Sequence, residues 1–466
     1  MSFELMAPLM FAGLVVFLLM GYPVAFSLAA NGLLFGLLGM KMGFFGFDQL
    51  QALADRVFGI MSNSTLLAIP FFTFMGLILE RSGMAEELLD SLGQLFGAIR
   101  GGLAYSVILV GALLAATTGV VAASVIAMGL ISLPIMLRFG YDKRLAAGVI
   151  AASGTLAQII PPSLVLIILA DQLGISVGDM YRGALVPALV LTGLYLGFVL
   201  LVSLAKPAAA PAMPPEARTL RGQALAKQAV VSMGPPLILV FLVLGTIFAG
   251  IATPTEGGAM GATGALFLAI AKKRLSLDLL KQAMDSTTRL TSFVIFILIG
   301  STVFSLVFRL MDGDLWVESL LVGLPGGALG FLIVVNLLVF VLAFFLDFFE
   351  IAFIIVPLLA PVAHKLGIDL IWFGVLLGIN MQTSFMHPPF GFALFYLRSV
   401  APKSVRTSDI YWGAIPFVVI QVLMVVLVLS FPGLVGAHPE ATHTGSMEIR
   451  TEDAGAGYLL PPESKP

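Results

Sequence analysis

Apolar residues are gathered into long runs, separated by short polar stretches, along most of the chain. These runs have roughly the 20 residues that a helix needs to cross a bilayer. They lie at 5–20, 23–40, 64–80, 145–170, 184–205, 231–251, 256–271, 291–308, 370–397 and 411–434. The pattern predicts an all-α polytopic membrane protein.

Two further apolar runs, 103–137 and 328–363, are too long for a single crossing. Small or polar residues interrupt both runs near the middle, so we expect each to form a re-entrant hairpin. The positive-inside rule favours the same arrangement, because the loops rich in Lys and Arg all fall inside only if both hairpins return to their own side. Both chain termini then lie outside.

The two halves of the chain resemble each other at a fixed offset of 227 residues. One half places residues 142–144 inside and the other places residues 364–369 outside, so the halves are predicted to be inverted-topology repeats, as in many secondary transporters. The offset relates Pro134 to Pro361, Gly140 to Gly367, Asp142 to Asp369, and the diproline at 161–162 to that at 388–389.

This arrangement divides the chain into four parts. We expect a first inverted repeat at 1–205 with a hairpin at 103–137 and a broken helix at 145–170, a cytoplasmic linker at 206–230, a second inverted repeat at 231–436 with a hairpin at 328–363 and a broken helix at 370–397, and a disordered C-terminal tail at 437–466. Amphipathic patterns predict surface helices at 48–61, 85–99, 274–288 and 315–324.

Each predicted broken helix carries polar residues next to its diproline. Proline lacks an amide donor and clashes with the preceding turn, so carbonyl groups are freed at a depth where water is absent. Freed carbonyls with hydroxyl and amide oxygens suit a small alkali cation, and an exposed half-helix N-terminus favours an anion. The cation-binding candidates are Ser153, Gly154, Thr155, Asn380, Gln382, Thr383 and Asp347, with sodium the only metal expected. The substrate-binding candidates are Thr117, Thr118, Ser124, Pro161, Pro162, Ser384, His387, Pro388 and Pro389.

Several candidates have a second interpretation. Thr117 and Thr118 equally suit close helix packing. Asp347 and Glu350 stand three residues apart on one helical face, where they serve either a hydrated hairpin tip or cation binding. His387 either fills a hydrogen bond at the helix break or senses protons. A single proline kink is usually satisfied by neighbouring groups, whereas two breaks at repeat-related positions favour a shared ligand site.

Composition removes several classes of function. The chain is 59% hydrophobic and 11% charged, with a mean hydropathy of +1.07, and its net charge of −2 gives no basic surface typical of nucleic-acid binding. It has no cysteine, which excludes disulfides and thiolate metal sites. Neither a phosphate-binding loop nor an HExxH motif occurs, and loop aspartates such as Asp142 are not placed to form a buried protease dyad. We therefore expect no enzyme, no cofactor and no transition-metal site.

Five short sequences are distinctive when taken together: LLAIPFF at 66–72, IIPPS at 159–163, GIATPTEGGAMGA at 250–262, FLDFFEIAFIIVP at 345–357 and HPPFG at 387–391. Over about 1–435 the chain resembles the large membrane subunit of the tripartite ATP-independent periplasmic (TRAP) transporters. The resemblance implies an elevator-type transporter, similar to the ion transporter superfamily, in which outer spans hold a mobile domain made of both hairpins and both broken helices.

The same resemblance implies sodium-driven uptake of a small organic acid across the bacterial inner membrane. It also implies two protein partners, a small membrane subunit of about four spans and a periplasmic substrate-binding protein. The forms DFFEIAFIIVP and HPPFGFALFYLR resemble a branch associated with 2-oxo acids, related monocarboxylates, and mannitol or chloroaromatic compounds. An ion or solute channel stays open as the alternative, because re-entrant loops also build selectivity filters.

Overall fold

The computed structural model describes residues 3–220, 222–388 and 391–436, without the side chains of Leu19 and Thr118. Within these ranges the chain is helical and contains no strand. The α-helices are α1 (Met6–Leu19), α2 (Val24–Lys41), α3 (Phe47–Met61), α4 (Ala68–Arg81), α5 (Met84–Phe96), α6 (Gly102–Thr118), α7 (Val121–Arg138), α8 (Lys143–Thr155), α9 (Leu164–Leu173), α10 (Val177–Ala205), α11 (Gly222–Phe248), α12 (Pro254–Ala271), α13 (Leu277–Leu310), α14 (Gly313–Val322), α15 (Gly327–Leu342), α16 (Phe348–Glu350), α17 (Val356–Lys365), α18 (Leu370–Met381), α19 (Phe392–Val400) and α20 (Thr407–Ser430). Short 3-10 turns include Ser64–Leu67, Leu156–Gln158 and Gln382–Phe385, and a π-helical turn spans Ile351–Ile355.

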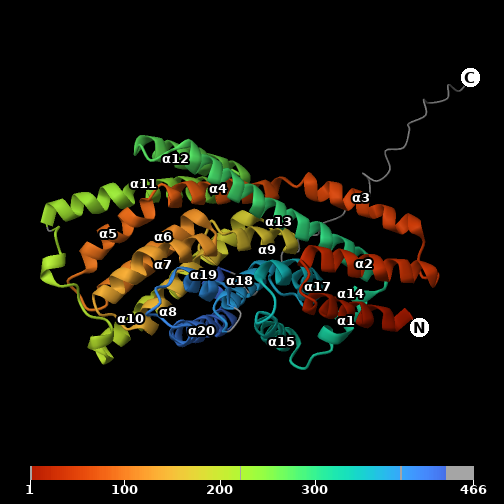
Figure 1. The fold of residues 1–466 in the computed structure, drawn as a ribbon. Coiled ribbons are helices and arrows are strands. Elements are labelled where there is room, and N and C mark those ends of the chain that lie inside the picture. Colours follow the sequence, from red (N-terminus) through yellow and green to blue (C-terminus); the bar gives the residue numbers. More distant parts are fainter. Residues whose placement is uncertain (1–2, 221, 389–390, 437–466) are drawn as a thin grey trace, which may run out of the picture.

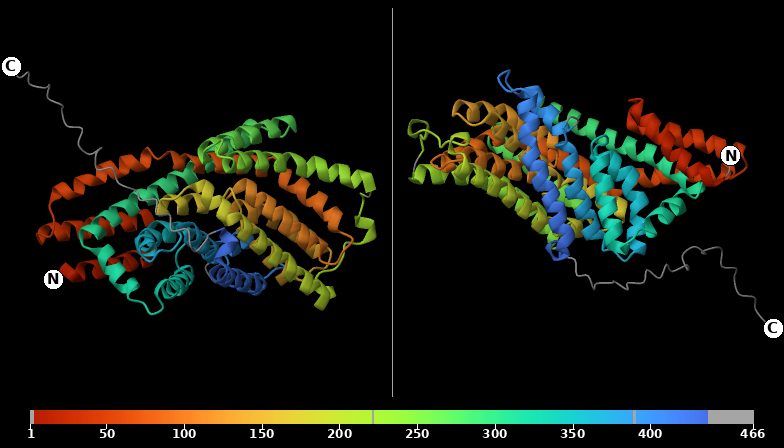
Figure 2. Two further views of the ribbon diagram at one scale, coloured as in Figure 1. Left: turned by 180° about the vertical axis from the view of Figure 1, so that it is seen from behind. Right: turned by 90° about the horizontal axis from the view of Figure 1, so that it is seen from below.

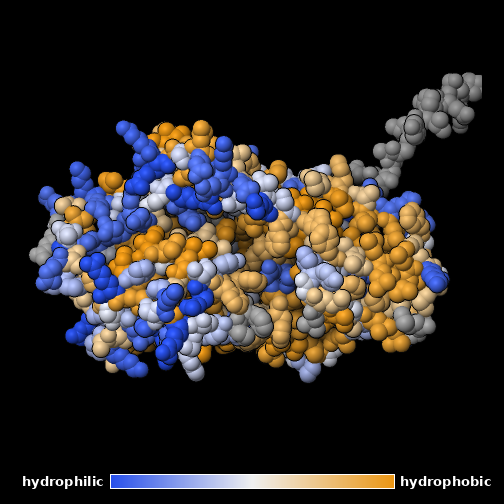
Figure 3. Space-filling view, viewed as in Figure 1, coloured by the Kyte–Doolittle hydropathy of each residue, from blue (hydrophilic) through white to orange (hydrophobic). Residues whose placement is uncertain are grey.

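Eight helices of the described chain are long and apolar enough to cross a membrane, judged by length and composition. A bent pair, α14 and α15 at 114°, raises the number to nine when it is counted as one span. Large apolar side chains are also exposed on many of these helices, and Figure 3 shows them in orange over the region of α1 and α2. Such a surface suits lipid rather than water, and the predicted all-α membrane fold is confirmed.

The helix boundaries repeat at the offset seen in the sequence. Shifting α7 by 227 residues gives 348–365, the range covered by α16, the π-helical turn and α17. The same shift relates the first residues of α8 and α18, Lys143 and Leu370, and it relates α9 to α19 within one residue. Each half thus contains a pair of helices followed by a broken helix. The opposite orientation of the halves in the membrane stays a prediction.

The two halves differ where the third helix joins the following span. In the first half a new helical segment begins after Asn63, whose side chain accepts a hydrogen bond from the Thr65 N–H at 2.9 Å. The equivalent residue in the second half is Leu290, which cannot cap a helix, so α13 runs on unbroken. The prediction of two separate elements, a surface helix at 274–288 and a span at 291–308, is therefore wrong.

The helices form two groups. Helix α13 packs against α2, α3 and α4, while α12 packs against α4 and α11. With α1, α5 and α14 we call these helices the outer group. The inner group consists of α6 to α9 and α15 to α19, the two helix pairs and the two broken helices. Figures 1 and 2 show the outer group along the upper edge and at the ends of the molecule, with the inner group and the long helices α10 and α20 beside it.

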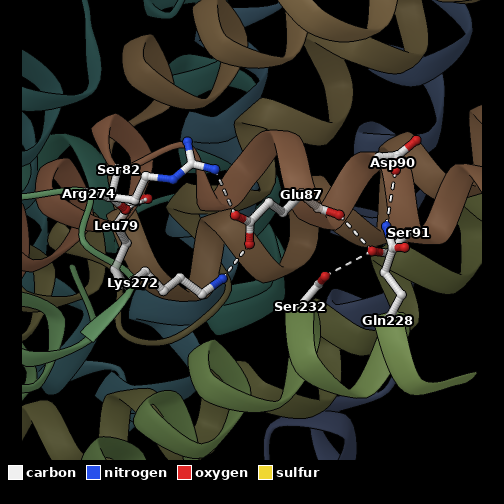
Figure 4. A network of polar contacts seen from close by, with 9 residues as sticks. All are labelled: Leu79, Ser82, Glu87, Asp90, Ser91, Gln228, Ser232, Lys272 and Arg274. Atoms are coloured by element: carbon white, nitrogen blue, oxygen red, sulfur yellow. Dashed lines mark hydrogen bonds and ion pairs between the residues drawn. The ribbon is translucent and has the colours of Figure 1, made fainter. Parts of the chain in front are cut away.

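Polar contacts fasten α5 to its neighbours in the outer group (Figure 4). The Glu87 carboxylate pairs with Lys272, which follows α12, and with Arg274 at 3.1 Å. One turn further along α5, the Ser91 hydroxyl donates to Ser232 of α11 at 3.0 Å. A helix with a polar face is thereby held against two apolar helices of the outer group.

The predicted linker is partly helical, because α11 begins at Gly222 and so includes part of 206–230. Its first part lies against the base of the first helix pair, where the Gly101 N–H donates to the Ala210 carbonyl at 2.9 Å. The linker therefore covers the start of α6 before the second half begins. The tail predicted at 437–466 lies outside the described residues.

Candidate functional site

Both broken helices are interrupted at repeat-related positions. Helix α8 ends at Thr155, continues as a 3-10 turn, and α9 begins at Leu164. Helix α18 ends at Met381, continues in the same way, and α19 begins at Phe392. A diproline lies in each gap, and since proline supplies no amide the helix cannot continue through it. The sequence predicted both interruptions.

The hydroxyl groups just before each break are buried and donate to carbonyls of the preceding turn. A hydroxyl oxygen that donates its single proton keeps its lone pairs available as acceptors. These bonds run from Ser153 to Ile150 at 3.0 Å, Thr155 to Ala152 at 2.8 Å, Thr383 to Asn380 at 2.7 Å and Ser384 to Met381 at 2.7 Å.

One hydrogen bond joins the two breaks directly. The Gln382 side-chain amide donates to Thr155 Oγ1 at 3.0 Å, and these two residues are 227 positions apart. Gln421 of α20 donates to the same oxygen at 3.4 Å and to the Tyr195 hydroxyl at 2.9 Å. All four side chains are buried. The two repeats therefore meet at equivalent residues inside the molecule.

This cluster leaves two oxygen atoms without donors. The side-chain carbonyl oxygens of Gln382 and Gln421 are buried and find no hydrogen-bond partner in the described ranges. A buried acceptor without a donor costs about 1–3 kcal/mol, and a positively charged group would remove that cost. The arrangement therefore fits a small cation held by neutral oxygen ligands.

The remaining cation candidates lie in different settings. Asn380 donates to the backbone and side-chain oxygens of Asn336 in α15, at 2.7 and 3.0 Å. At Gly154 an added Cβ would lie 2.3 Å from Val125, so this glycine lets α8 sit close to α7. Asp347 belongs to the tip of the second helix pair. Of the cation candidates from different repeats, the structure brings Thr155 and Gln382 into contact.

The tips of the two helix pairs have different chemistry. Gly119 and Val120 join α6 to α7, with Gly119 in the left-handed region at φ 59°. At the second tip, Asp347 accepts a hydrogen bond from the Glu350 N–H at 3.0 Å, and Glu350 accepts one from the Asp347 N–H at 3.1 Å. This reciprocal pattern is a capping box, which starts α16 and fixes both acidic side chains.

A cavity of about 370 Å³ lies between both tips, both broken helices and α13. Gln158, Asp347 and Tyr396 contribute the long polar side chains of its described wall. Both side-chain polar atoms of Gln158 are buried without a partner in the described chain. Aromatic rings form much of the remaining wall: Phe293, Phe348, Phe349, Phe385, Phe392 and Tyr396.

Asp347 is the one candidate residue on the described wall of this cavity. Thr117 donates to the Leu114 carbonyl at 2.9 Å, and the His387 ring packs between Phe340 and Phe344, with ring centres 4.5 and 4.1 Å away. Ser124, Pro161, Pro162 and Ser384 are buried, and Pro388 is half-buried. The Thr118 side chain and Pro389 lie outside the description.

Sequence reasoning missed Gln158 and the aromatic wall. Gln158 carried a usable signal, since it is a polar residue in the apolar run 145–170, three positions before the diproline. The aromatic residues carried none, because Phe293, Phe348 and Phe392 belong to separate elements that only the fold brings together.

Comparison with known proteins places the chain in a family. A family model described as the DctM component of the tripartite ATP-independent periplasmic transporter matches residues 11–434. The chain belongs to this TRAP transporter family. It is therefore a large permease subunit and a multi-span protein of the bacterial inner membrane, and the resemblance inferred from the sequence is confirmed.

Several relatives carry the same subunit name. The C4-dicarboxylate TRAP transporter large permease protein DctM of Pseudomonas aeruginosa is 32% identical over 393 residues, which cover 84% of this chain and 90% of that protein. The DctM protein of Vibrio cholerae is 30% identical, with 91% and 95% covered. The sialic acid TRAP transporter large permease protein SiaM of Vibrio cholerae is 28% identical, with 90% and 95% covered. These relatives are permeases rather than enzymes.

A solved structure has the same fold. The YdaH transporter of Alcanivorax borkumensis superposes with a TM-score of 0.57 over 84% of this chain and 90% of that chain, at 16% identity. At this identity the similarity supports the helical architecture and carries no information on substrate.

Proposed function

We propose that this TRAP permease takes up a small organic acid by secondary transport coupled to sodium. The contact between Thr155 and Gln382 carries the proposal, because it sets two helix breaks from different repeats against each other. Broken helices that meet between repeats are the usual place for substrate and coupling ions in secondary transporters. Gln158, three residues beyond Thr155, lines the cavity where the acid would bind.

Sodium fits the buried oxygen atoms at this contact. Gln382 and Gln421 would offer their unpartnered carbonyl oxygens, and Thr155 would hold both side chains in place by accepting a hydrogen bond from each amide. Neutral oxygen ligands of this kind suit a hard cation. When bound, sodium supplies a positive charge whose inward movement through 100 mV contributes about 2.3 kcal/mol to uptake.

The cavity supports an acid with one carboxylate and an apolar body. Its described wall has no Lys or Arg, and Asp347 adds an acidic group, so a second substrate carboxylate would meet no basic side chain there. The Gln158 amide and the Tyr396 hydroxyl are able to donate to one carboxylate, while the surrounding rings pack against an apolar body. This substrate class differs from the C4-dicarboxylate named for the DctM relatives.

In the proposed cycle, the inner group moves as an elevator against the outer group and carries the cavity across the membrane. A periplasmic substrate-binding protein delivers the acid, and a small membrane subunit of about four spans supports the outer group. We infer both partners from the family, which is one component of a tripartite transporter.

The sodium site is tested by thermal unfolding in nanodiscs, with sodium chloride compared to potassium and choline chloride at equal ionic strength. A ligand that binds only the native state stabilises it by about 2.7 kcal/mol at 100 times its dissociation constant. We expect saturable stabilisation by sodium, and its loss in Thr155→Val. Thr192→Val is the matched control, since that buried hydroxyl donates to Ala188 within α10. Equal responses of both variants would reject the site.

The substrate class is tested by binding to the purified protein in sodium. We expect benzoate to stabilise the protein more than succinate, and Gln158→Leu to remove the benzoate effect. Gln51→Leu, on the exposed face of α3, is the control. A stronger response to succinate contradicts the proposed class. Sodium current without coupled uptake in proteoliposomes would favour the channel alternative instead.

A further inference from the structure

A second cavity, of about 320 Å³, lies between α3, α9 and α13, apart from the one lined by Gln158. Two basic residues line it, Arg56 from α3 and Arg309 from the end of α13. Ser305 and Thr302, one and two turns before Arg309, add hydroxyl groups to the same wall. Polar side chains therefore line much of this second cavity, whereas aromatic rings line much of the first.

Within the described chain, neither guanidinium has an acidic partner. No carboxylate of the described chain lies within 4.0 Å of Arg56 or Arg309, although six other ion pairs meet this limit. Asp171 also lines the cavity, but it accepts hydrogen bonds from the Asn63 amide at 2.6 Å and from Gln172 at 3.0 Å. The one acidic side chain on this wall is thus engaged by neutral amides.

The two basic groups act on each other. Partial burial lowers the pKa of Arg56, and the positive charge of Arg309 lowers it further. Two like charges that face a shared cavity repel each other, and an anion between them would turn repulsion into two attractive contacts. Guanidinium groups bind oxyanions through paired N–H donors, which makes carboxylate and phosphate groups the best match.

The cavity lies where the two groups of helices meet. Arg56 and Arg309 belong to the outer group, while Asp171 lies in the last turn of α9, in the inner group. The Asn63–Asp171 hydrogen bond connects the two groups at this point. The positive-inside arrangement places Asn63, Asp171 and the end of α13 on the outer side of the membrane, so the cavity faces the side from which the acid arrives.

We propose that Arg56 and Arg309 form an oxyanion site on the outer side of the scaffold, separate from the cavity beside the helix breaks. The bound group is a carboxylate or a phosphate, presented by a free acid or by a lipid headgroup. Because the arginines belong to the outer group, this site stays in place when the inner group moves. It would concentrate anions at the outer boundary between the two groups.

The absence of cysteine allows a direct test. Thr302→Cys places one thiol in the cavity wall, and its maleimide labelling rate is measured on the full chain in phosphatidylcholine nanodiscs. We expect potassium benzoate or inorganic phosphate to slow labelling about threefold relative to chloride, and benzamide to have no effect, because the paired guanidinium donors require an oxyanion. Adding Arg309→Gln or Arg56→Gln should abolish the protection.

Arg182→Gln is the matched control, because Arg182 is an exposed arginine on the same predicted side and lies outside the cavity wall. Protection that is lost in the cavity variants and kept in the control supports a free oxyanion as ligand. Slow labelling in phosphatidylglycerol nanodiscs without added anion, with the fast rate restored by Arg309→Gln, supports the site with the phosphate of an anionic lipid as ligand. Labelling that is indifferent to anion, lipid and both arginines overturns the proposal. If a glutamine variant fails to fold, Arg309→Lys takes its place in the labelling test. Its thermal unfolding must then match that of the chain without this substitution.

Discussion

The two helix pairs of the inner group occupy equivalent places in the repeats, but equivalent positions carry different polar contacts. The first pair is polar at its base, where the Leu103 N–H donates to the Tyr141 hydroxyl at 3.2 Å. The equivalent of Tyr141 in the second half is Ile368. The second pair is polar at its tip, where Asp347 caps a helix, while the equivalent Val120 makes no side-chain capping bond.

The two helix pairs also differ in how closely equivalent residues are packed. Gly111 of α6 lies so close to α8 that an added Cβ would come within 2.5 Å of Ser153. Its equivalent in α15 is Leu338, which is 40% exposed. The first pair is thus anchored on its broken helix, and the second presents the Asp347 carboxylate to the cavity. The two helix pairs therefore share a backbone arrangement but use different side chains at equivalent positions.

The largest effect is expected from Gly111→Val. The new side chain would overlap Ser153, including its backbone oxygen at 3.0 Å, so the free energy of unfolding should fall by at least about 3 kcal/mol. Leu338→Val is the control and should change it by less than about 0.5 kcal/mol. Denaturant unfolding in nanodiscs measures both, and equal losses would remove the proposed difference in anchoring.

Tyr141→Phe should have the next largest effect. It should lower the free energy of unfolding by about 1.5 kcal/mol, because the buried Leu103 N–H loses its acceptor. Burial raises the pKa of Tyr141 to about 12. The folded chain therefore holds the phenol proton more tightly than the unfolded chain, whose tyrosine pKa is about 10. This contribution is complete below about pH 10 and is lost as the pH rises through about 12.

Thermal unfolding of the wild type and Tyr141→Phe between pH 8 and pH 12 isolates this contribution, since their difference should shrink across that window. Ile368→Val, the equivalent change in the second pair, should give a loss that does not depend on pH. A constant difference between wild type and Tyr141→Phe would show that the hydroxyl has no special role at the base.

Asp347→Ala should cost about 1 kcal/mol, the usual value for the loss of an N-cap side chain. Asp347→Asn should be nearly neutral for stability, because its amide oxygen still accepts the Glu350 N–H. Val120→Ala, at the equivalent position, removes no capping hydrogen bond and should cause no such loss of stability at the start of α7. If Asn also weakens the sodium response measured by thermal unfolding, the Asp347 charge acts on the cation in addition to capping the helix.

Glu350→Gln should have the smallest effect, within about 0.5 kcal/mol, since the amide oxygen replaces the carboxylate in the capping box. The same unfolding experiment in sodium and in potassium checks it. A large loss of stability would mean that the Glu350 charge, rather than its hydrogen bond, holds the second tip.

Much of the fold was predictable because a bilayer imposes its length on apolar helices. The run 103–137 indicated a helix pair, and the offset of 227 residues indicated a second pair and two matched breaks. It was harder to predict whether two neighbouring helical segments join into one helix. Both Asn63 and Leu290 lie at the junction of a polar and an apolar segment, and the single capping side chain of Asn63 decides which junction breaks.

The site was predictable only in part, because sequence indicates which residues are polar at a break but not which of them meet. Thr155 and Gln382 were candidates for separate reasons, and the fold pairs them. Gln421, on the last long helix, joins them without a diproline or a helix break nearby. The aromatic wall depends on side chains whose apolar character is also typical of packing against lipid, so composition could not distinguish the two uses.

The contact between Thr155 and Gln382 has a consequence for the history of the chain. When two copies of one segment are related by a twofold axis, a residue can touch its own counterpart only on that axis. If the halves are inverted repeats as predicted, the contact lies at the axis between them. In an ancestor with identical halves, one amino acid would have faced itself there, and every substitution would have changed both sides at once. The two halves of this chain are separate segments with different sequences, so a donor and an acceptor of different kinds stand at this point.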